Sequence, residues 1–64
     1  MQNHLRTLRQ DRGMTQQTLA DHLGVSRQTV HSIEAGKYDP SLPLAFKIAK
    51  VLERSIEQIF VPED

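Results

Sequence analysis

Four hydrogen-bonding side chains are expected on one side of a short helix near the middle of the chain. At about 100° per residue, residues 26–35 (SRQTVHSIEA) place Val30 and Ile33 on one face and the four polar side chains opposite them. These outward residues are Arg27, Gln28, His31 and Ser32. Arg fits O6 and N7 of guanine, and Gln fits N6 and N7 of adenine. The face could therefore read base edges in DNA, although an ordinary solvated helix can carry the same pattern.

Glycine, proline and capping residues divide the chain into five expected helices. They cover residues 3–12, 16–23, 27–35, 42–52 and a short segment that ends near Phe60. Thr15 and Ser26 are good N-cap residues, and Ser55 with Gln58 forms a capping box for the last helix. In the fourth helix the residues expected to face inward are Leu44, Ile48, Val51 and Leu52. Because the segments are short and helical in period, the sequence predicts an all-α domain without strands.

The chain has 64 residues, which is enough for one domain over residues 1–64. A domain of this size buries only about 60% of the surface that its unfolded chain exposes. It contains no cysteine, so disulfides are excluded, and no two of its three histidines share a helix at the i, i+4 spacing. We therefore expect no metal and no cofactor, and stability must come from helix packing or dimerisation.

Enzymes, secreted proteins and membrane proteins are not expected. The sequence has no glycine-rich phosphate loop and no nucleophile with a base at a recognisable spacing, and it is hardly long enough to form a cleft. Its first residues, MQNHLRTLRQ, lack the apolar stretch of a signal peptide, and no segment approaches the roughly 18–20 apolar residues of a membrane span. We expect a cytoplasmic protein with no membrane partner.

Charge is unevenly distributed, although eight Lys or Arg balance eight Asp or Glu. Residues 1–52 contain seven basic and four acidic side chains, whereas residues 53–64 contain one basic and four acidic. The local field at a surface matters more for binding than the sum over the molecule. The first part of the chain can therefore face a polyanion while the C-terminal end lies away from it.

A helix-turn-helix is predicted over residues 15–35, where two short helices are joined by a turn that contains Gly24. Residues 8–36, LRQDRGMTQQTLADHLGVSRQTVHSIEAG, strongly resemble the phage repressor and Cro-type helix-turn-helix family, often called the xenobiotic response element family. The resemblance extends through YDPSLPLAFKIAKVLERSIEQIF. The matching features are Arg9, Thr15-Gln16, Ala20, Gly24, Ser26-Arg27-Gln28, Ile33-Glu34 and Gly36-Lys37. The resemblance implies a five-helix, lambda-repressor-like domain that binds double-stranded DNA and regulates transcription.

The resemblance also implies roles for individual residues. In that family the third helix reads bases, so the base-reading residues would be Arg27, Gln28, His31 and Ser32. Gln16, Lys37 and Tyr38 would hold phosphates, and the helix N-terminus at Gln16 favours an anion on physical grounds as well. The family further suggests that Arg9 pairs with Glu34 and ties the first helix to the third.

We expect a homodimeric repressor that reads a palindromic operator, because one module of this size buries only roughly 600–1,000 Å² on DNA. The expected dimerisation segment is 53–64, with interface residues Phe60, Val61, Ile59, Ile56 and Leu52. Phe60 and Val61 would then lie at the edge of the domain; alternatively, Phe60 folds back into the core of its own chain. A different alternative for the function is an antitoxin-like module that masks another protein, with DNA binding secondary.

Overall fold

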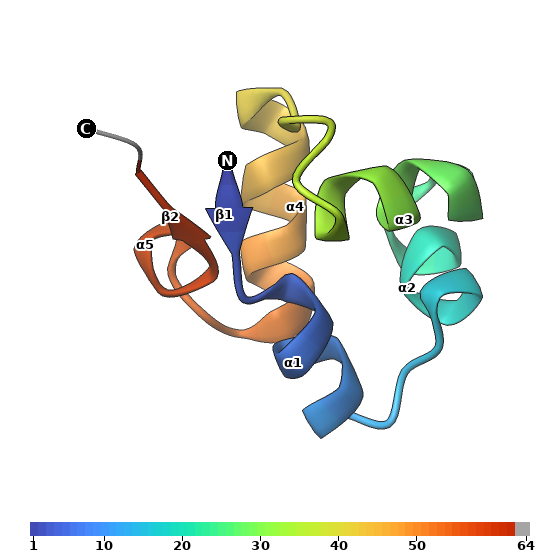
Figure 1. The fold of residues 1–64 in the computed structure, drawn as a ribbon. Helices are drawn as coiled ribbons and strands as arrows, with labels where there is room; N and C mark the ends of the chain where they lie inside the picture. Colours follow the sequence, from blue (N-terminus) through green and yellow to red (C-terminus); the bar gives the residue numbers. More distant parts are fainter. Residues whose placement is uncertain (63–64) are drawn as a thin grey trace.

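The computed structural model describes residues 1–62 of the chain. Five helices and two short strands follow one another along these residues (Figure 1), in the order β1 (Gln2–Asn3), α1 (Leu5–Asp11), α2 (Gln16–Leu23), α3 (Arg27–Glu34), α4 (Leu42–Leu52), α5 (Ile56–Ile59) and β2 (Phe60–Val61). The predicted fold class is confirmed, and α2 and α4 have the predicted bounds. No helix in this part of the chain is long and apolar enough to cross a membrane.

Hydroxyl side chains cap the N-termini of four helices. In each case the hydroxyl oxygen accepts a hydrogen bond of 3.0–3.3 Å from the backbone N–H three residues later. The capping residues are Thr15, Ser26, Ser41 and Ser55. At the other end of α2, Gly24 adopts a left-handed conformation with φ of 73°, which glycine tolerates without strain. These signals are local in the sequence, and they fix where α2 begins and ends.

A two-stranded antiparallel sheet joins the two ends of the described chain. Gln2 faces Val61 and Asn3 faces Phe60 across the sheet. The prediction that the chain lacks strands was therefore wrong, and the first helix begins at Leu5 instead of residue 3. Strands of two residues are too short to show an alternating pattern, and their pairing depends on contacts between distant parts of the chain. The Asn3 side chain holds this arrangement, because its amide nitrogen donates to the Ile33 carbonyl at 2.8 Å.

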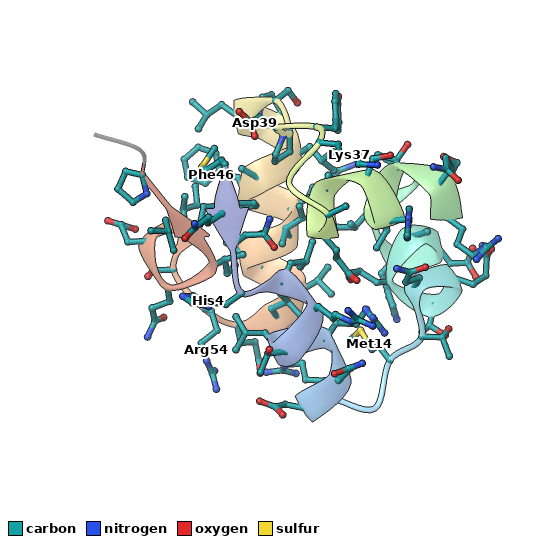
Figure 2. The ribbon with its side chains drawn as sticks, in the orientation of Figure 1. His4, Met14, Lys37, Asp39, Phe46 and Arg54 are labelled. Atoms are coloured by element: carbon teal, nitrogen blue, oxygen red, sulfur yellow. The ribbon has the colours of Figure 1, made fainter. Side chains whose placement is uncertain are left out.

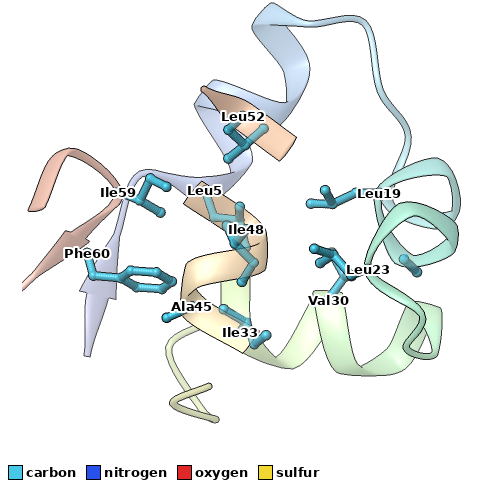
Figure 3. Packing of buried hydrophobic residues seen from close by; sticks show 11 residues of the cluster. Leu5, Leu19, Leu23, Val30, Ile33, Ala45, Ile48, Leu52, Ile59 and Phe60 are labelled. Atoms are coloured by element: carbon cyan, nitrogen blue, oxygen red, sulfur yellow. The ribbon is translucent and has the colours of Figure 1, made fainter. Parts of the chain in front are cut away.

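The hydrophobic core surrounds α4. Figure 3 shows Ile48 of this helix between Leu5 and Ile59 on one side and Leu19 and Val30 on the other. The largest fully buried side chains are Leu5, Leu19, Leu23, Ile33, Ile48, Leu52, Ile59 and Val30. The buried face of α4 is turned slightly from the predicted one, since Ala45, Ile48 and Leu52 are buried while Leu44 and Val51 are only partly so. Helix α4 thus forms the support on which α2 and α3 rest.

Three of the five residues expected in a dimer interface lie inside the core of a single chain. Phe60 is only 5% exposed, and Leu52 and Ile59 are fully buried. The expectation that Phe60 lies at the domain edge was wrong, because β2 turns its ring inward toward Ala45 (Figure 3). Ile56 is partly buried and packs against the core, and Val61 is also partly buried. The rest of the expected dimerisation segment includes residues 63–64, which lie outside the described residues.

Candidate nucleic-acid interface

Helices α2 and α3 pack closely across the turn at Gly24. Ala20 of α2 is fully buried at their contact, and Val30 and Ile33 direct the opposite face of α3 into the core. The turn is closed by a hydrogen bond of 3.1 Å from the Val25 N–H to the Ala20 carbonyl. This packing leaves one long face of α3 in contact with solvent.

The exposed face of α3 carries the four residues expected to read bases. Arg27, Gln28 and His31 are exposed and Ser32 is partly buried. The Gln28 amide nitrogen lies 3.5 Å from the Ser32 hydroxyl, one turn along the helix. Within the part of the chain that the structure describes, no carboxylate pairs with Arg27. Its guanidinium is therefore available to a partner outside the chain.

Tyr38 lies beside this face, not apart from it. A surface hollow of about 230 Å³ is lined by Gln28, Thr29, Ser32 and Tyr38. The phenol ring is exposed, and the preceding residue, Lys37, follows a turn in which Gly36 has φ of 75°. The Lys37 N–H donates to the Ser32 carbonyl at 3.0 Å, so this turn is fixed to the last part of α3. Both residues expected to hold phosphate on this side thus follow α3 directly, in a segment whose first part is fixed to the end of that helix.

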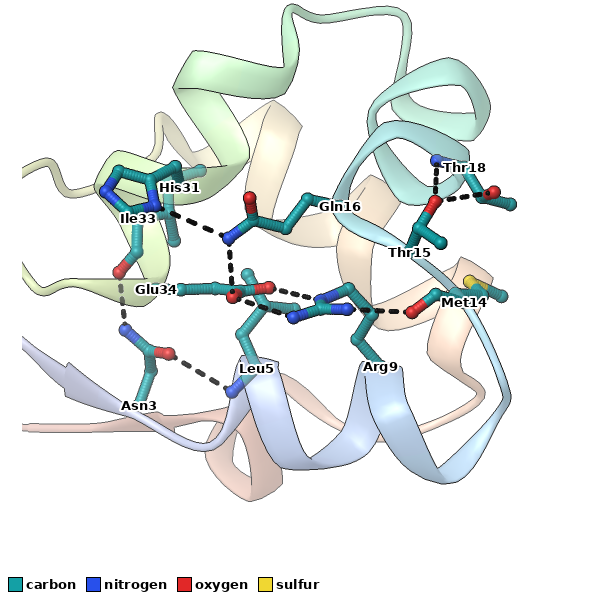
Figure 4. A network of polar contacts seen from close by, with 10 residues as sticks. All are labelled: Asn3, Leu5, Arg9, Met14, Thr15, Gln16, Thr18, His31, Ile33 and Glu34. Atoms are coloured by element: carbon teal, nitrogen blue, oxygen red, sulfur yellow. Dashed lines mark hydrogen bonds and ion pairs between the residues drawn. The ribbon is translucent and has the colours of Figure 1, made fainter.

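A buried ion pair links α1 to the end of α3, as Figure 4 shows. The Arg9 Nε lies 2.6 Å from Glu34 Oε2, and the Arg9 Nη2 lies 3.2 Å from Glu34 Oε1. The third contact of the guanidinium is a hydrogen bond of 2.8 Å from Nη1 to the Met14 carbonyl. The two side chains are only 9% and 4% exposed. The acid at the end of α3 is therefore paired inside the protein instead of lying on the exposed face of the helix.

Gln16 extends this network to His31 on the exposed face of α3. Its amide nitrogen donates to Glu34 Oε1 at 3.2 Å and lies 3.5 Å from His31 Nδ1 (Figure 4). Both contacts use the amide NH₂ group, so they leave the side-chain oxygen and the backbone N–H groups at the start of α2 for other partners. The side chain expected to hold a phosphate is thus also a link between the ion pair and His31.

Arg6 is a candidate contact that the sequence reasoning missed. A hollow of about 120 Å³ is lined by Arg6, Gln16, His31, Glu34 and Ala35. Arg6 is exposed, and no carboxylate among residues 1–62 pairs with it. The available signal was the spacing, because Arg6 precedes Arg9 by three residues and so lies near it on α1. Because Arg9 is expected to pair with the third helix, its neighbour Arg6 is expected on the same side of the first helix.

An exposed ion pair lies at the C-terminal end of α1. Arg12 Nη2 is 2.6 Å from Glu53 Oε1, and hydrogen bonding by this guanidinium lowers the pKa of Glu53 below its ordinary value. Figure 2 shows Arg54, the next residue, on the side of the molecule away from α3. These charges are therefore separated from the face that carries Arg27 and Lys37.

Comparisons with known proteins agree with this geometry. A family described as helix-turn-helix matches residues 5–59. An HTH-type transcriptional regulator of Methanocaldococcus jannaschii is 58% identical over 64 residues, covering 100% of this chain and 97% of the relative. The HTH-type transcriptional regulator YgzD of Bacillus subtilis is 44% identical and covers the same shares of the two chains.

A solved structure has the same fold. The restriction-modification controller protein C.AhdI from Aeromonas hydrophila superposes with a TM-score of 0.80 at 36% identity, over 88% of this chain and 85% of that one. The relatives are thus described as HTH-type transcriptional regulators, and the solved structure as a controller protein. The chain is therefore a member of the phage repressor and Cro-type, or xenobiotic response element, helix-turn-helix family: a transcriptional regulator with a helix-turn-helix DNA-binding domain.

Proposed function

We propose that the protein is a repressor that binds a palindromic operator as a homodimer, with α3 of each copy in the major groove. The observation that carries the proposal is the distribution of charge around α3. Arg27 on its outer face has no carboxylate partner among residues 1–62, whereas the acid of the same helix, Glu34, is buried against Arg9. Burial of Glu34 against Arg9 removes a negative charge from the surface of α3. This arrangement favours binding of a polyanion by α3 and has no advantage for a helix that only faces water.

The reading residues differ in the contacts they can make. Arg27 can bind the O6 and N7 atoms of guanine with two hydrogen bonds, and Gln28 can bind N6 and N7 of adenine in the same way. His31 and Ser32 lie one turn further along and can each add a single hydrogen bond. Each two-bond contact of the kind open to Arg27 or Gln28 discriminates against the wrong base by about 1–3 kcal/mol.

Phosphate contacts are proposed on both sides of the reading helix. Lys37 and Tyr38 would contact the backbone after α3, and the N-terminus of α2 with Gln16 and Arg6 would contact it before α3. Groups of this kind fix the position of the protein on the duplex and make the affinity depend on salt, but they do not select sequence.

A dimer follows from the small size of one domain. A single module covers roughly 600–1,000 Å² on DNA, so tight specific binding requires two half-sites about 34 Å apart. Occupation of such an operator is sufficient to exclude other proteins from the same DNA, which is why repression is the simplest regulatory outcome.

Selection of bound sequences from a random duplex pool, followed by gel-shift assays, tests the proposal. We expect a palindromic site that is bound at least ~10³-fold more tightly than random DNA. Gln28→Ala should weaken binding to the selected site and remove the preference for one base pair of the half-site. Lys37→Ala should instead weaken binding to all sequences and reduce the salt dependence of the affinity. Arg54→Ala is the matched control for loss of a cation, because Arg54 lies away from α3. Equal binding of selected and random DNA would contradict the proposal.

A further inference from the structure

Two large apolar side chains on α4 remain exposed in a chain that buries its other apolar residues well. Leu42 is 64% exposed and Phe46 is 58% exposed, and they lie one helical turn apart. Tyr38 is the third exposed large apolar residue among residues 1–62, but it lines the hollow beside α3. Leu42 and Phe46 have no such role in the proposed DNA contact.

This apolar face of α4, formed by Leu42 and Phe46, borders the two-stranded sheet. Ala45 points toward Phe60 in the core (Figure 3), and Phe46 follows it by about 100° around the helix. Figure 2 shows Phe46 on the side of α4 that is turned away from α2 and α3. The face therefore lies on a different side of the molecule from the proposed DNA contact.

We propose that the apolar face of α4 is the two-fold interface with a second copy of this chain. The proposal rests on the proposed function and deepens it, since it says how the two operator-reading domains are joined. In a two-fold interface the same surface of both copies is buried, so an apolar face can satisfy itself without any other partner. The predicted C-terminal interface lacks this property, because its largest side chain, Phe60, is already buried.

The area of the face suits the centre of a small interface. A fully exposed aromatic side chain presents about 150–250 Å², so Leu42 and Phe46 together present on the order of 200 Å² per chain. Pairing two copies would remove about 400 Å² of apolar surface from water, compared with roughly 1,200–2,000 Å² in total for a standard interface. The surrounding polar residues must supply the remaining area as a rim.

Charges at the two ends of the face are complementary in an antiparallel arrangement. Lys50 lies one turn beyond Phe46, and Asp39 lies just before α4, where its carboxylate is 3.2 Å from the Met1 ammonium group. If α4 of one copy runs antiparallel to α4 of the other with Phe46 against Leu42, Lys50 of one copy approaches Asp39 of the other. Lys50 pairs with no carboxylate in the described part of its own chain.

The spacing of two half-sites limits where the two-fold axis can lie. A separation of about 34 Å between the reading helices places the two-fold axis about 17 Å from each of them. The chain measures 32 × 21 × 20 Å along its principal axes, so a two-fold axis at its surface can lie at about this distance from α3.

Sedimentation of matched variants tests the interface. Leu42→Ser with Phe46→Ser should convert the dimer to a monomer, raising the dissociation constant at least tenfold, while the helical circular dichroism is retained because both side chains are exposed. Val61→Thr, a change of nearly equal size at one of the C-terminal positions, should remain dimeric. A Leu42/Phe46 variant that still sediments as a dimer, or a wild-type protein that is monomeric at all concentrations, would overturn the inference.

Cross-linking and charge reversal provide independent measurements. The chain contains no cysteine, so Phe46→Cys should form a covalent dimer on mild oxidation, whereas Arg54→Cys should not. Lys50→Glu should weaken the dimer, and adding Asp39→Lys should restore it. Equal cross-linking of the two cysteine variants would count against the interface. DNA selection with the wild-type protein tests the proposed function separately, because a dimer joined through α4 can exist whether or not it binds an operator.

Discussion

Replacing Arg9 by methionine should be among the most damaging single changes to the stability of this protein. The substitution leaves the Glu34 carboxylate 4% exposed with only the Gln16 amide as a hydrogen-bond donor, and it also removes the donor to the Met14 carbonyl. Loss of one partner from a buried ion pair costs about 3–5 kcal/mol. A chain of 64 residues has roughly 3–10 kcal/mol of stability in total. Arg9→Met should therefore bring the protein close to unfolding.

A double-mutant cycle separates the pair interaction from the loss of each side chain. Glu34→Met should also destabilise, but the variant with both changes should be more stable than the sum of the single effects predicts, because it leaves no unpaired charge in the core. We expect a coupling free energy well above the ~1 kcal/mol upper range of exposed ion pairs. The same cycle on Arg12 and Glu53 is the control and should give a smaller coupling, because water screens that pair.

Urea unfolding followed by circular dichroism supplies the free energies, since the chain has no tryptophan. If Arg9→Met is already partly unfolded, all four proteins of the cycle can be compared in trimethylamine N-oxide, which strengthens burial of the core. Additive effects of the two substitutions would refute the reasoning. They would mean that the pair contributes nothing beyond the packing of its two side chains.

Three further changes have definite expected outcomes. Asn3→Ala should cost about 1–3 kcal/mol in urea unfolding, because it leaves the Leu5 N–H without its acceptor and removes one of the two donors to the Ile33 carbonyl. Ser26→Ala should cost about 1 kcal/mol through loss of the α3 cap, and Ser26→Gly should recover most of it in the same assay. The pKa of Glu53 is lowered by hydrogen bonding from Arg12, so the folded value lies below the unfolded one. This contribution to stability is present at neutral pH and is lost as pH falls through the folded pKa. Arg12→Ala should remove that part of the acid dependence of unfolding. The carboxyl chemical shifts of Glu53 in this variant should show that its pKa has risen.

Elements with local signals could be predicted from the sequence. The start of α2 follows from Thr15 and its end from Gly24, and α4 starts after Ser41 with Pro43 in its first turn. The pairing of Arg9 with Glu34 could be inferred only through the family resemblance, because the two residues are far apart in the chain.

Features that depend on distant contacts could not be predicted in the same way. Phe60 looked like a surface residue because the last helix is too short to cover it, and nothing near it in the sequence indicates a strand that pairs with residues 2–3. Phe46 was not identified as exposed, since the hydrophobic pattern of α4 gives its inward side but not which apolar residues stay uncovered. Gln16 was assigned to phosphate alone because its bond to Glu34 depends on how α1, α2 and α3 meet.

The pairing of β1 with β2 sets the moment at which a newly made chain can finish folding. Helices α2 and α3 are separated only by a short turn, so they can associate soon after they leave the ribosome. The first strand must wait, because its partners, Phe60 and Val61, are made almost a whole chain later. A nascent chain stalled before Phe60 would expose apolar surface and be prone to aggregation or chaperone binding. Asn3 joins β1 to the end of α3, so α3 gains this last support only when β1 takes its place beside Phe60 and Val61.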